Sequence, residues 1–429
     1  MAGLIACAAW LAYWQFARLA GAQAPRVYYD SQAYLQIAAR PVGLDRLYDY
    51  KPLVVPLIDG AAGGDPQAIR AIQICVAMLA WSILALALAR AVRRTWVRGL
   101  AVGVAIAFLL AAPRVGWTAA VLSESINDSL LALVVAGALA LATLDAGRPR
   151  VAIAIATGIA LLAWLLTRDT NAVTALVAIA LAALVWWRRW SRRGLALAAV
   201  GTAGALVVLW STRVAPEPLP FQRGWWTPQL TARASYPIAN NLLTRVLPVD
   251  RAWLVERGAP VADLERLKFP DKLVGIAPEN TAAQAWVASD GAATYVRWLL
   301  RHPGDRIAEL GGDWVTLLVG RNAGAMPVGW AAGDRGALGP LRRLTTNRYL
   351  LLALLLASPL LVFRPRRDPR RGLALVLIAS GLLGAIAAYY GDAAELSRHC
   401  YGSGQQIALG LFLALLARLD TVGGRHAQR

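Results

Sequence analysis

The chain has 429 residues, of which 58% are hydrophobic and 16% charged, and its formal net charge is +19. Soluble domains are usually about 45–50% apolar and about a quarter charged. With a mean hydropathy of +0.49, the composition excludes an ordinary soluble enzyme and a disordered chain. It indicates a multi-span membrane protein.

The positive charge does not indicate a nucleic-acid-binding protein. Lys51, Lys268 and Lys272 are the only lysines in the sequence, and the arginines occur in short runs between apolar stretches. The three cysteines are an odd number and imply no disulfide framework. We therefore expect membrane lipids, and no nucleic acid, among the partners.

Apolar segments predict an all-α polytopic protein with about ten transmembrane helices. A span needs about 20 apolar residues, or fewer where the flanking side chains reach the interface. Ala22-Gln23-Ala24 resembles a signal-peptidase site after the first segment, but no basic stretch precedes that segment, so we expect it to be retained. The predicted spans are 2–20, 71–89, 99–112, 124–144, 151–166, 172–187, 194–210, 349–363, 372–389 and 404–417.

The arginines assign the loops to the two sides of the membrane. Eighteen arginines follow the even-numbered spans, whereas the alternate short loops hold only Arg114, Arg168 and Arg398. Because basic residues accumulate in cytoplasmic loops, both termini are predicted to be cytoplasmic. The expected location is a bacterial cytoplasmic membrane, with any active site on its outer face.

Two segments on the outer side are long. The first is a loop over 21–70 within a unit of seven spans (1–210), and the second is the polar block 211–348. We expect 211–348 to form a small extracytoplasmic domain between spans seven and eight, before spans eight to ten and a cytoplasmic tail (349–429). Its clearest helix is Ala292–Leu300, which proline and glycine end at His302-Pro303-Gly304.

The first candidate site residues lie in the long loop. Asp30 precedes a short amphipathic helix that carries Tyr34 and begins at Ser31. Asp30 is either the N-cap of that helix or a general base held at the membrane surface. Lys51, which opens a proline-containing stretch, is either an interfacial charge or a phosphate ligand.

A second candidate group opens span four. Glu124 and Asp128 are four residues apart, so they share one helix face. The partial positive charge at a helix N-terminus stabilises carboxylates, and the simpler interpretation is that both acids serve this purpose. Asp128 would lie about a turn inside the membrane, where an ionisable side chain usually faces a cavity or a partner.

The remaining candidates are basic residues of the short outer loops. Arg168 stands beside Asp169, and Glu395 stands near Arg398 and His399, so each loop could hold a local ion pair. Guanidinium groups also match phosphate geometry. The alternative prediction is that Arg168, Arg398 and His399 meet on one phosphate, with Arg114 as a further candidate.

These motifs resemble those of the GT-C superfamily, the multi-span glycosyltransferases that use polyprenyl-phosphate sugars. The stretch from Tyr295 to Pro303 also resembles segments of uncharacterised actinobacterial members. The resemblance covers most of the chain, although each motif is short. It rests on the Asp-Ser-x-x-Tyr-Leu stretch at Asp30, the Lys-Pro stretch at Lys51, the Ser123-Glu124 pair, and the Glu395, Arg398 and His399 group.

The resemblance implies inverting sugar transfer from a polyprenyl-phosphate donor to an envelope glycan, lipid or protein on the outer face. Asp30 would be the general base, and Lys51, Arg114, Arg168, Arg398 and His399 would bind the donor phosphate. Substrate contacts are expected at Tyr34, Glu124, Asp128 and Glu395. No cofactor is predicted; the family leaves a divalent metal open, but the first loop has no Asp-x-Asp motif.

Two other functions remain as alternatives. A transporter or flippase of a lipid-linked or small substrate predicts ionisable residues deep in several spans, whereas most charges here cluster at span ends. A non-catalytic subunit of envelope assembly predicts that Asp30→Asn leaves function intact.

Overall fold

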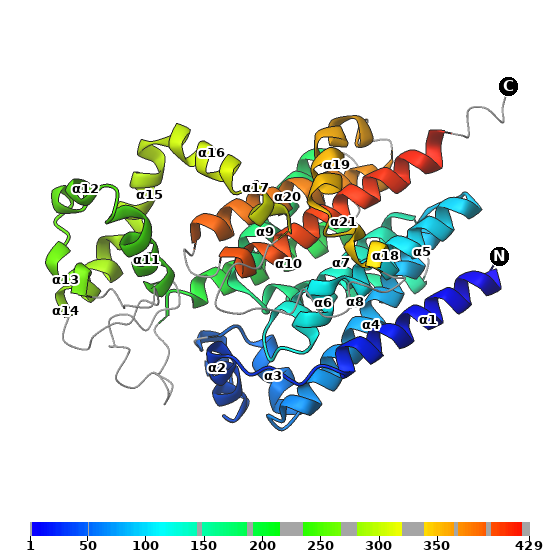
Figure 1. Ribbon diagram of the computed structural model, residues 1–429, viewed down its shortest axis with the longest axis horizontal. Coiled ribbons are helices and arrows are strands. Elements are labelled where there is room, and N and C mark those ends of the chain that lie inside the picture. Colours follow the sequence, from blue (N-terminus) through cyan, green and yellow to red (C-terminus); the bar gives the residue numbers. More distant parts are fainter. Residues whose placement is uncertain are drawn as a thin grey trace.

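The computed structural model describes nine stretches of the chain. Within them the regular secondary structure is helical, apart from one isolated parallel bridge between Arg26 and Ala120. Figure 1 shows the long helices side by side, with the start of α1 and the end of α21 at one end of the molecule. The described residues are 2–49, 51–143, 148–186, 192–214, 235–266, 281–319, 339–363, 368–391 and 396–422.

Each predicted span coincides with a helix. The bounds differ most at the last one, which was expected over 404–417 and extends over Leu396–Val422. The ten helices are α1 (Ala2–Gly21), α4 (Pro66–Ala91), α5 (Thr95–Leu110), α7 (Glu124–Thr143), α8 (Arg148–Leu165), α9 (Asp169–Trp186), α10 (Arg192–Ser211), α19 (Arg348–Leu361), α20 (Pro369–Gly391) and α21 (Leu396–Val422).

Within the described residues, six helices are long and apolar enough to cross a membrane, namely α4, α7, α9, α10, α20 and α21. A seventh crossing is available if α5 and α6 (Ala112–Thr118), bent by 50° at their junction, form one span. Pro113 explains the break, because a continuous helix would need an N–H at position 113 to donate to the Leu109 carbonyl, and proline has none. Helices α8 and α19 are shorter apolar helices, so ten crossings remain a prediction.

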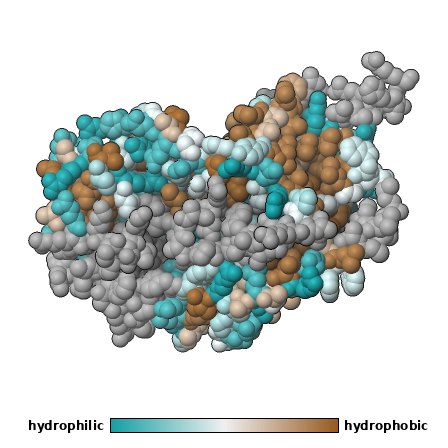
Figure 2. Space-filling view, in the orientation of Figure 1, coloured by the Kyte–Doolittle hydropathy of each residue, from teal (hydrophilic) through white to brown (hydrophobic). Residues whose placement is uncertain are grey.

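The core of the bundle is aromatic and aliphatic, and small residues let its helices approach closely. Phe108 stacks on Trp81 with ring centroids 5.2 Å apart and meets Phe412 edge-on at 5.8 Å. A Cβ on Gly381 of α20 would lie 2.8 Å from the side chain of Ile407 on α21. Figure 2 shows apolar residues concentrated over the long helices and more hydrophilic residues over the lobe on the left.

A small lobe, described over 235–266 and 281–312, lies beyond one end of the long helices (Figure 1). It has its own hydrophobic core, which includes Leu242, Leu254 and Trp298. The expected helix over Ala292–Leu300 is confirmed as α15. The elements are α11 (Ser235–Asn241), η5 (Leu242–Val246), α12 (Arg251–Glu256), α13 (Val261–Arg266), α14 (Thr281–Trp286), η6 (Val287–Gly291), α15 (Ala292–Arg301) and α16 (Pro303–Gly312).

The rest of the described part of 211–348 packs on the bundle. Leu318 and Val319 of α17 (Trp314–Val319) belong to the main core. The Arg342 side chain of α18 (Gly339–Leu344) donates from Nε to the Leu110 carbonyl at the end of α5, at 3.2 Å. The block therefore contains a lobe and two short helices that complete the bundle, and its extracytoplasmic location stays a prediction.

A polar junction joins the lobe to the end of α20. Arg245 of η5 pairs with Glu309 of α16 at 2.6 Å and donates to the Tyr389 carbonyl at 2.8 Å. The Tyr389 hydroxyl donates to Asp313 at 2.6 Å, and the Tyr295 hydroxyl donates to the Tyr390 carbonyl at 2.9 Å. These contacts tie the position of the lobe to the end of α20.

We expect Tyr389→Phe to loosen this junction. The substitution removes a hydrogen bond to a carboxylate, a type of bond that contributes about 1.5–3 kcal/mol, and the aromatic ring is kept. The melting temperature in detergent should fall, and protease should cut the lobe faster. The control is Tyr349→Phe. Tyr349 is 65% exposed, and its hydroxyl accepts a hydrogen bond only from the neighbouring Arg348 among the contacts described. Equal effects of both variants would contradict the role of the junction.

Helix α3 (Val54–Ala61) carries a buried acid. Asp59 is 1% exposed, and its Oδ2 atom has no hydrogen-bond partner. Burial raises the pKa of this carboxyl to about 7, because a low-dielectric environment disfavours the charged form. Asp59 is therefore largely protonated in mildly acidic solution.

We expect stability to depend on pH through Asp59. Its folded-state pKa is raised, so between about pH 4 and pH 7 the folded protein holds a proton that the unfolded chain has released. This contribution is fully present below the unfolded pKa and is lost as the pH rises through about 7. The melting temperature of Asp59→Asn relative to wild type should therefore be higher at pH 8 than at pH 5. A constant difference would contradict the assignment.

Candidate functional site

Backbone hydrogen bonds bring the candidate segments together. The Arg26 N–H donates to the Ala119 carbonyl at 2.8 Å, and the Val121 N–H donates to the Arg26 carbonyl at 3.0 Å. These bonds tie the segment before Asp30 to the segment before Glu124. The Val54 N–H donates to the Leu166 carbonyl at 3.0 Å, which fixes the stretch after Lys51 next to the turn that carries Arg168.

The structure excludes the N-cap interpretation of Asp30. Helix α2 (Tyr29–Ala38) begins two residues earlier than expected, and the Tyr28 N–H donates to the Ser31 hydroxyl at 2.9 Å. Asp30 lies in the first turn, and its carboxylate faces cations from two other segments. Its Oδ2 atom lies 2.7 Å from Arg398 Nη1 and 3.2 Å from Lys51 Nζ.

Glu124 joins two arginines from different helices. Its Oε1 atom accepts from Arg398 Nε at 2.5 Å and lies 3.5 Å from Arg168 Nη1. Arg168 Nη2 is 3.2 Å from Nδ1 of His399. A guanidinium can only donate, so Nδ1 of His399 is the acceptor and the ring is not doubly protonated. These contacts run between elements rather than within one loop.

The charged network, namely Asp30, Lys51, Glu124, Arg168, Arg398 and His399, therefore comes from five separated parts of the chain. The exposed fraction of its side chains is 0% for Glu124, 6% for Arg398 and 25% for Asp30. Solvent can therefore reach the network at Asp30 and not at Glu124. Bringing these charges out of water is tolerated because each carboxylate is paired.

Two opposing effects act on the Asp30 carboxyl. Burial by itself would raise its pKa, but the positive charges of Lys51 and Arg398 and their hydrogen bonds hold the pKa well below the usual aspartate range. Tyr34, on the same helix, is 3% exposed, and its ring lies 5.4 Å from Lys51 Nζ. Burial raises the pKa of the Tyr34 hydroxyl. Asp30 is therefore ionised and Tyr34 neutral near neutral pH.

Arg114 and Asp128 form a separate buried pair. Arg114 was expected in a short loop, but it lies in α6 and is 1% exposed. Its Nη2 atom is 3.1 Å from Asp128, its Nε donates to the Phe108 carbonyl at 2.9 Å, and its guanidinium lies over Trp81. These contacts account for the arginine by structure alone, and its phosphate-binding role stays a prediction.

The other site predictions have mixed outcomes. Arg398 and His399 lie in the first turns of α21 instead of a loop, while Arg168 lies in the expected turn between α8 and α9. Glu395 lies outside the described residues. The Asn171 amide, which residue type and spacing did not single out, donates to Asn127 Oδ1 at 2.7 Å. Asn127 directly precedes Asp128, and Asn171 lies two residues after Asp169, so sequence proximity to the other candidates would have identified both.

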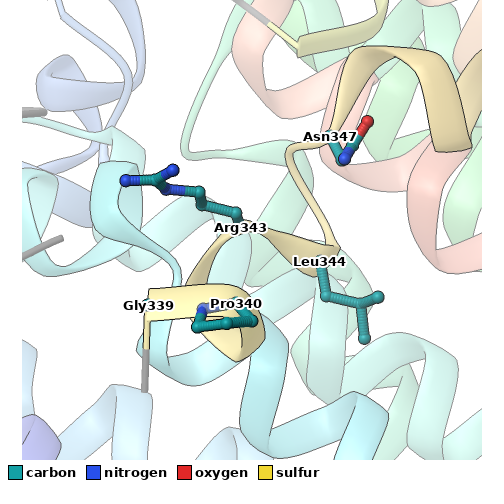
Figure 3. Close-up of a pocket in the computed structure, with 5 residues that line it drawn as sticks. All are labelled: Gly339, Pro340, Arg343, Leu344 and Asn347. Carbon is teal, nitrogen blue, oxygen red and sulfur yellow. The ribbon is translucent and has the colours of Figure 1, made fainter. Parts of the chain in front are cut away.

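Two further features bear on ligands. A cavity of about 350 Å³ is lined by Gly339, Pro340, Arg343, Leu344 and Asn347, from α18 and the turn before α19 (Figure 3). None of these residues belongs to the charged network. Among the described residues, no group of three His, Cys, Asp or Glu side chains is arranged to hold a metal ion.

Comparisons with known proteins give one structural likeness. No family model matches the chain, and no curated protein matches it. The crystal structure of ArnT from Cupriavidus metallidurans bound to undecaprenyl phosphate is 16% identical, with a TM-score of 0.33, over 99% of this chain and 78% of that one.

Proposed function

We propose that the chain is a membrane glycosyltransferase that moves a sugar from a polyprenyl-phosphate donor to an acceptor on the outer face, with inversion at the anomeric carbon. Asp30 takes the proton of the acceptor hydroxyl, whose oxygen attacks that carbon. The bond between the sugar and the phosphate oxygen breaks, and its electron pair leaves with polyprenyl phosphate. The acceptor is an envelope glycan, lipid or protein.

The observation that carries this proposal is the charged network itself. A base and a set of phosphate ligands are needed at one place, and the network supplies an ionised carboxylate beside Lys51 and Arg398. Arg168 is linked to Arg398 through Glu124. Asp30 is the more exposed of its two carboxylates. Guanidinium groups bind phosphate oxygens through paired N–H donors.

The charge of the network matches the charges in such a reaction. Lys51, Arg168 and Arg398 outnumber Asp30 and Glu124 by one positive charge, with His399 neutral. A sugar phosphodiester carries one negative charge, and the departing phosphate monoester approaches two. When Asp30 accepts the proton, the network gains the matching positive charge. Fixed cations of this kind stabilise developing negative charge most effectively where water is excluded.

The experiment is sugar transfer by the purified protein in detergent or liposomes. Polyprenyl-phosphate hexoses and pentoses serve as donors, and polyprenyl-phosphate release is measured with and without candidate acceptors. Release that depends on the donor, on an acceptor and on Arg398 supports the proposal. The acceptor product should have the opposite anomeric configuration to the donor.

The transporter or flippase alternative has one observation in its favour, the buried Arg114–Asp128 pair inside the helical bundle. Both members are neutralised by each other, which favours a structural role for the pair. Movement of a lipid-linked sugar across liposomes without any sugar transfer would favour this alternative instead.

A further inference from the structure

Asp30 occupies the side chains that a phosphate would need as ligands. Arg398 Nη1 and Lys51 Nζ, which the proposed function assigns to the donor phosphate, both contact the same carboxylate oxygen of Asp30. In the ligand-free protein, a carboxylate thus occupies cations that a phosphate oxygen would take. Carboxylate and phosphate are the two anions that suit such donors.

The two carboxylates of the network differ in how easily they can be replaced. Glu124 is fully buried and holds Arg398 and Arg168 together from the inside. Asp30 is 25% exposed and lies on the ten-residue helix α2, which is not among the candidate spans. An incoming anion can therefore displace Asp30 while Glu124 continues to position both arginines.

Displacement would also change Asp30 as a base. Burial favours the protonated carboxyl, and only the neighbouring cations reverse this preference and lower its pKa. When a phosphate draws Lys51 and Arg398 toward itself and adds negative charge nearby, the balance shifts toward the protonated form. The carboxylate is a weak base while it is held, and a stronger one after it is displaced.

We infer that Asp30 is an internal competitor of the donor phosphate: its carboxylate occupies Arg398 and Lys51 until a polyprenyl-phosphate group displaces it and so frees it to accept the proton of the acceptor. This inference rests on the proposed function and adds a coupling between donor binding and the base. It implies that donor binding prepares the carboxylate before the acceptor reacts.

The test is the affinity for polyprenyl phosphate, measured by thermophoresis or tryptophan fluorescence in micelles, with the neutral polyprenol as a control ligand. Asp30→Asn removes the competing charge and keeps the side-chain volume, and Asp30→Ser is a second variant. We expect both to bind polyprenyl phosphate at least about tenfold more tightly than wild type, which corresponds to about 1.4 kcal/mol. Polyprenol binding should not change.

Matched variants separate this effect from a general change in charge. Asp45→Asn removes an exposed acid from the same loop and should leave phosphate affinity unchanged, whereas Arg398→Gln should weaken it. If wild type binds polyprenyl phosphate and both Asp30 variants bind it equally or more weakly, the inference is overturned while the proposed function stands. If wild type shows no preference for the phosphate over the polyprenol, both are overturned.

Discussion

Replacing Asp30 with asparagine is expected to lower the rate of sugar transfer by about 10²–10⁴-fold, the usual contribution of a general base. The amide keeps the shape of the side chain but cannot accept the acceptor's proton. Because Asp30 competes with the donor phosphate in the inferred resting state, the KM for the donor should not rise. The measurement is steady-state transfer at saturating acceptor.

Asp45→Asn is the matched control, because Asp45 is an exposed acid in the same loop, and it should transfer sugar at the wild-type rate. An unchanged melting temperature for each variant would show that a lower rate does not come from loss of the folded structure. A normal rate for Asp30→Asn would remove Asp30 as the base, whereas no transfer by wild type with any donor and acceptor would favour the non-catalytic alternative.

Replacing Glu124 with glutamine is expected to have the largest effect on stability. Its carboxylate is 0% exposed and is the shared partner of Arg398 and Arg168. Removing one member of a buried ion pair typically costs about 3–5 kcal/mol, because the remaining charge stays buried without compensation. Here two guanidinium groups would lose a counter-charge, so the melting temperature in detergent should fall strongly and transfer should be lost.

The control for Glu124 is Glu265→Gln in the lobe. Glu265 also pairs with an arginine, Arg251 at 3.1 Å, but the two side chains are 47% and 61% exposed. Exposed ion pairs contribute little, because water screens the charges in both states. If the two variants had similar melting temperatures, Glu124 would not hold the network together.

The sequence predicted the helical class and the position of every long helix described. Hydropathy is a local property, and a membrane span must satisfy its backbone hydrogen bonds within its own helix. Each span can therefore be predicted from its own residues, without knowledge of its neighbours. The polar first turns of α21 show where this signal fails. Arg398 and His399 broke the apolar run and were assigned to a loop, although the helix continues through them.

The sequence also singled out the residues of the charged network, because ionisable residues at span ends are few and costly. It did not determine their partners. Arg168 and Arg398 had nearby acids in sequence, yet both contact Glu124, which is 44 and 274 residues away. A local ion pair and a long-range network have the same local sequence pattern, so residue spacing cannot distinguish them.

By itself, then, the sequence determined a helical chain with apolar spans and a short set of candidate charges at the ends of those spans. Only the tertiary structure decided which of those charges meet, that Asp30 is held by Arg398 and Lys51, and that Arg114 is paired with Asp128 inside the bundle. The physical reason is that apolar periodicity acts within each helix, whereas the electrostatic environment of a carboxylate depends on cations that helix packing brings to it.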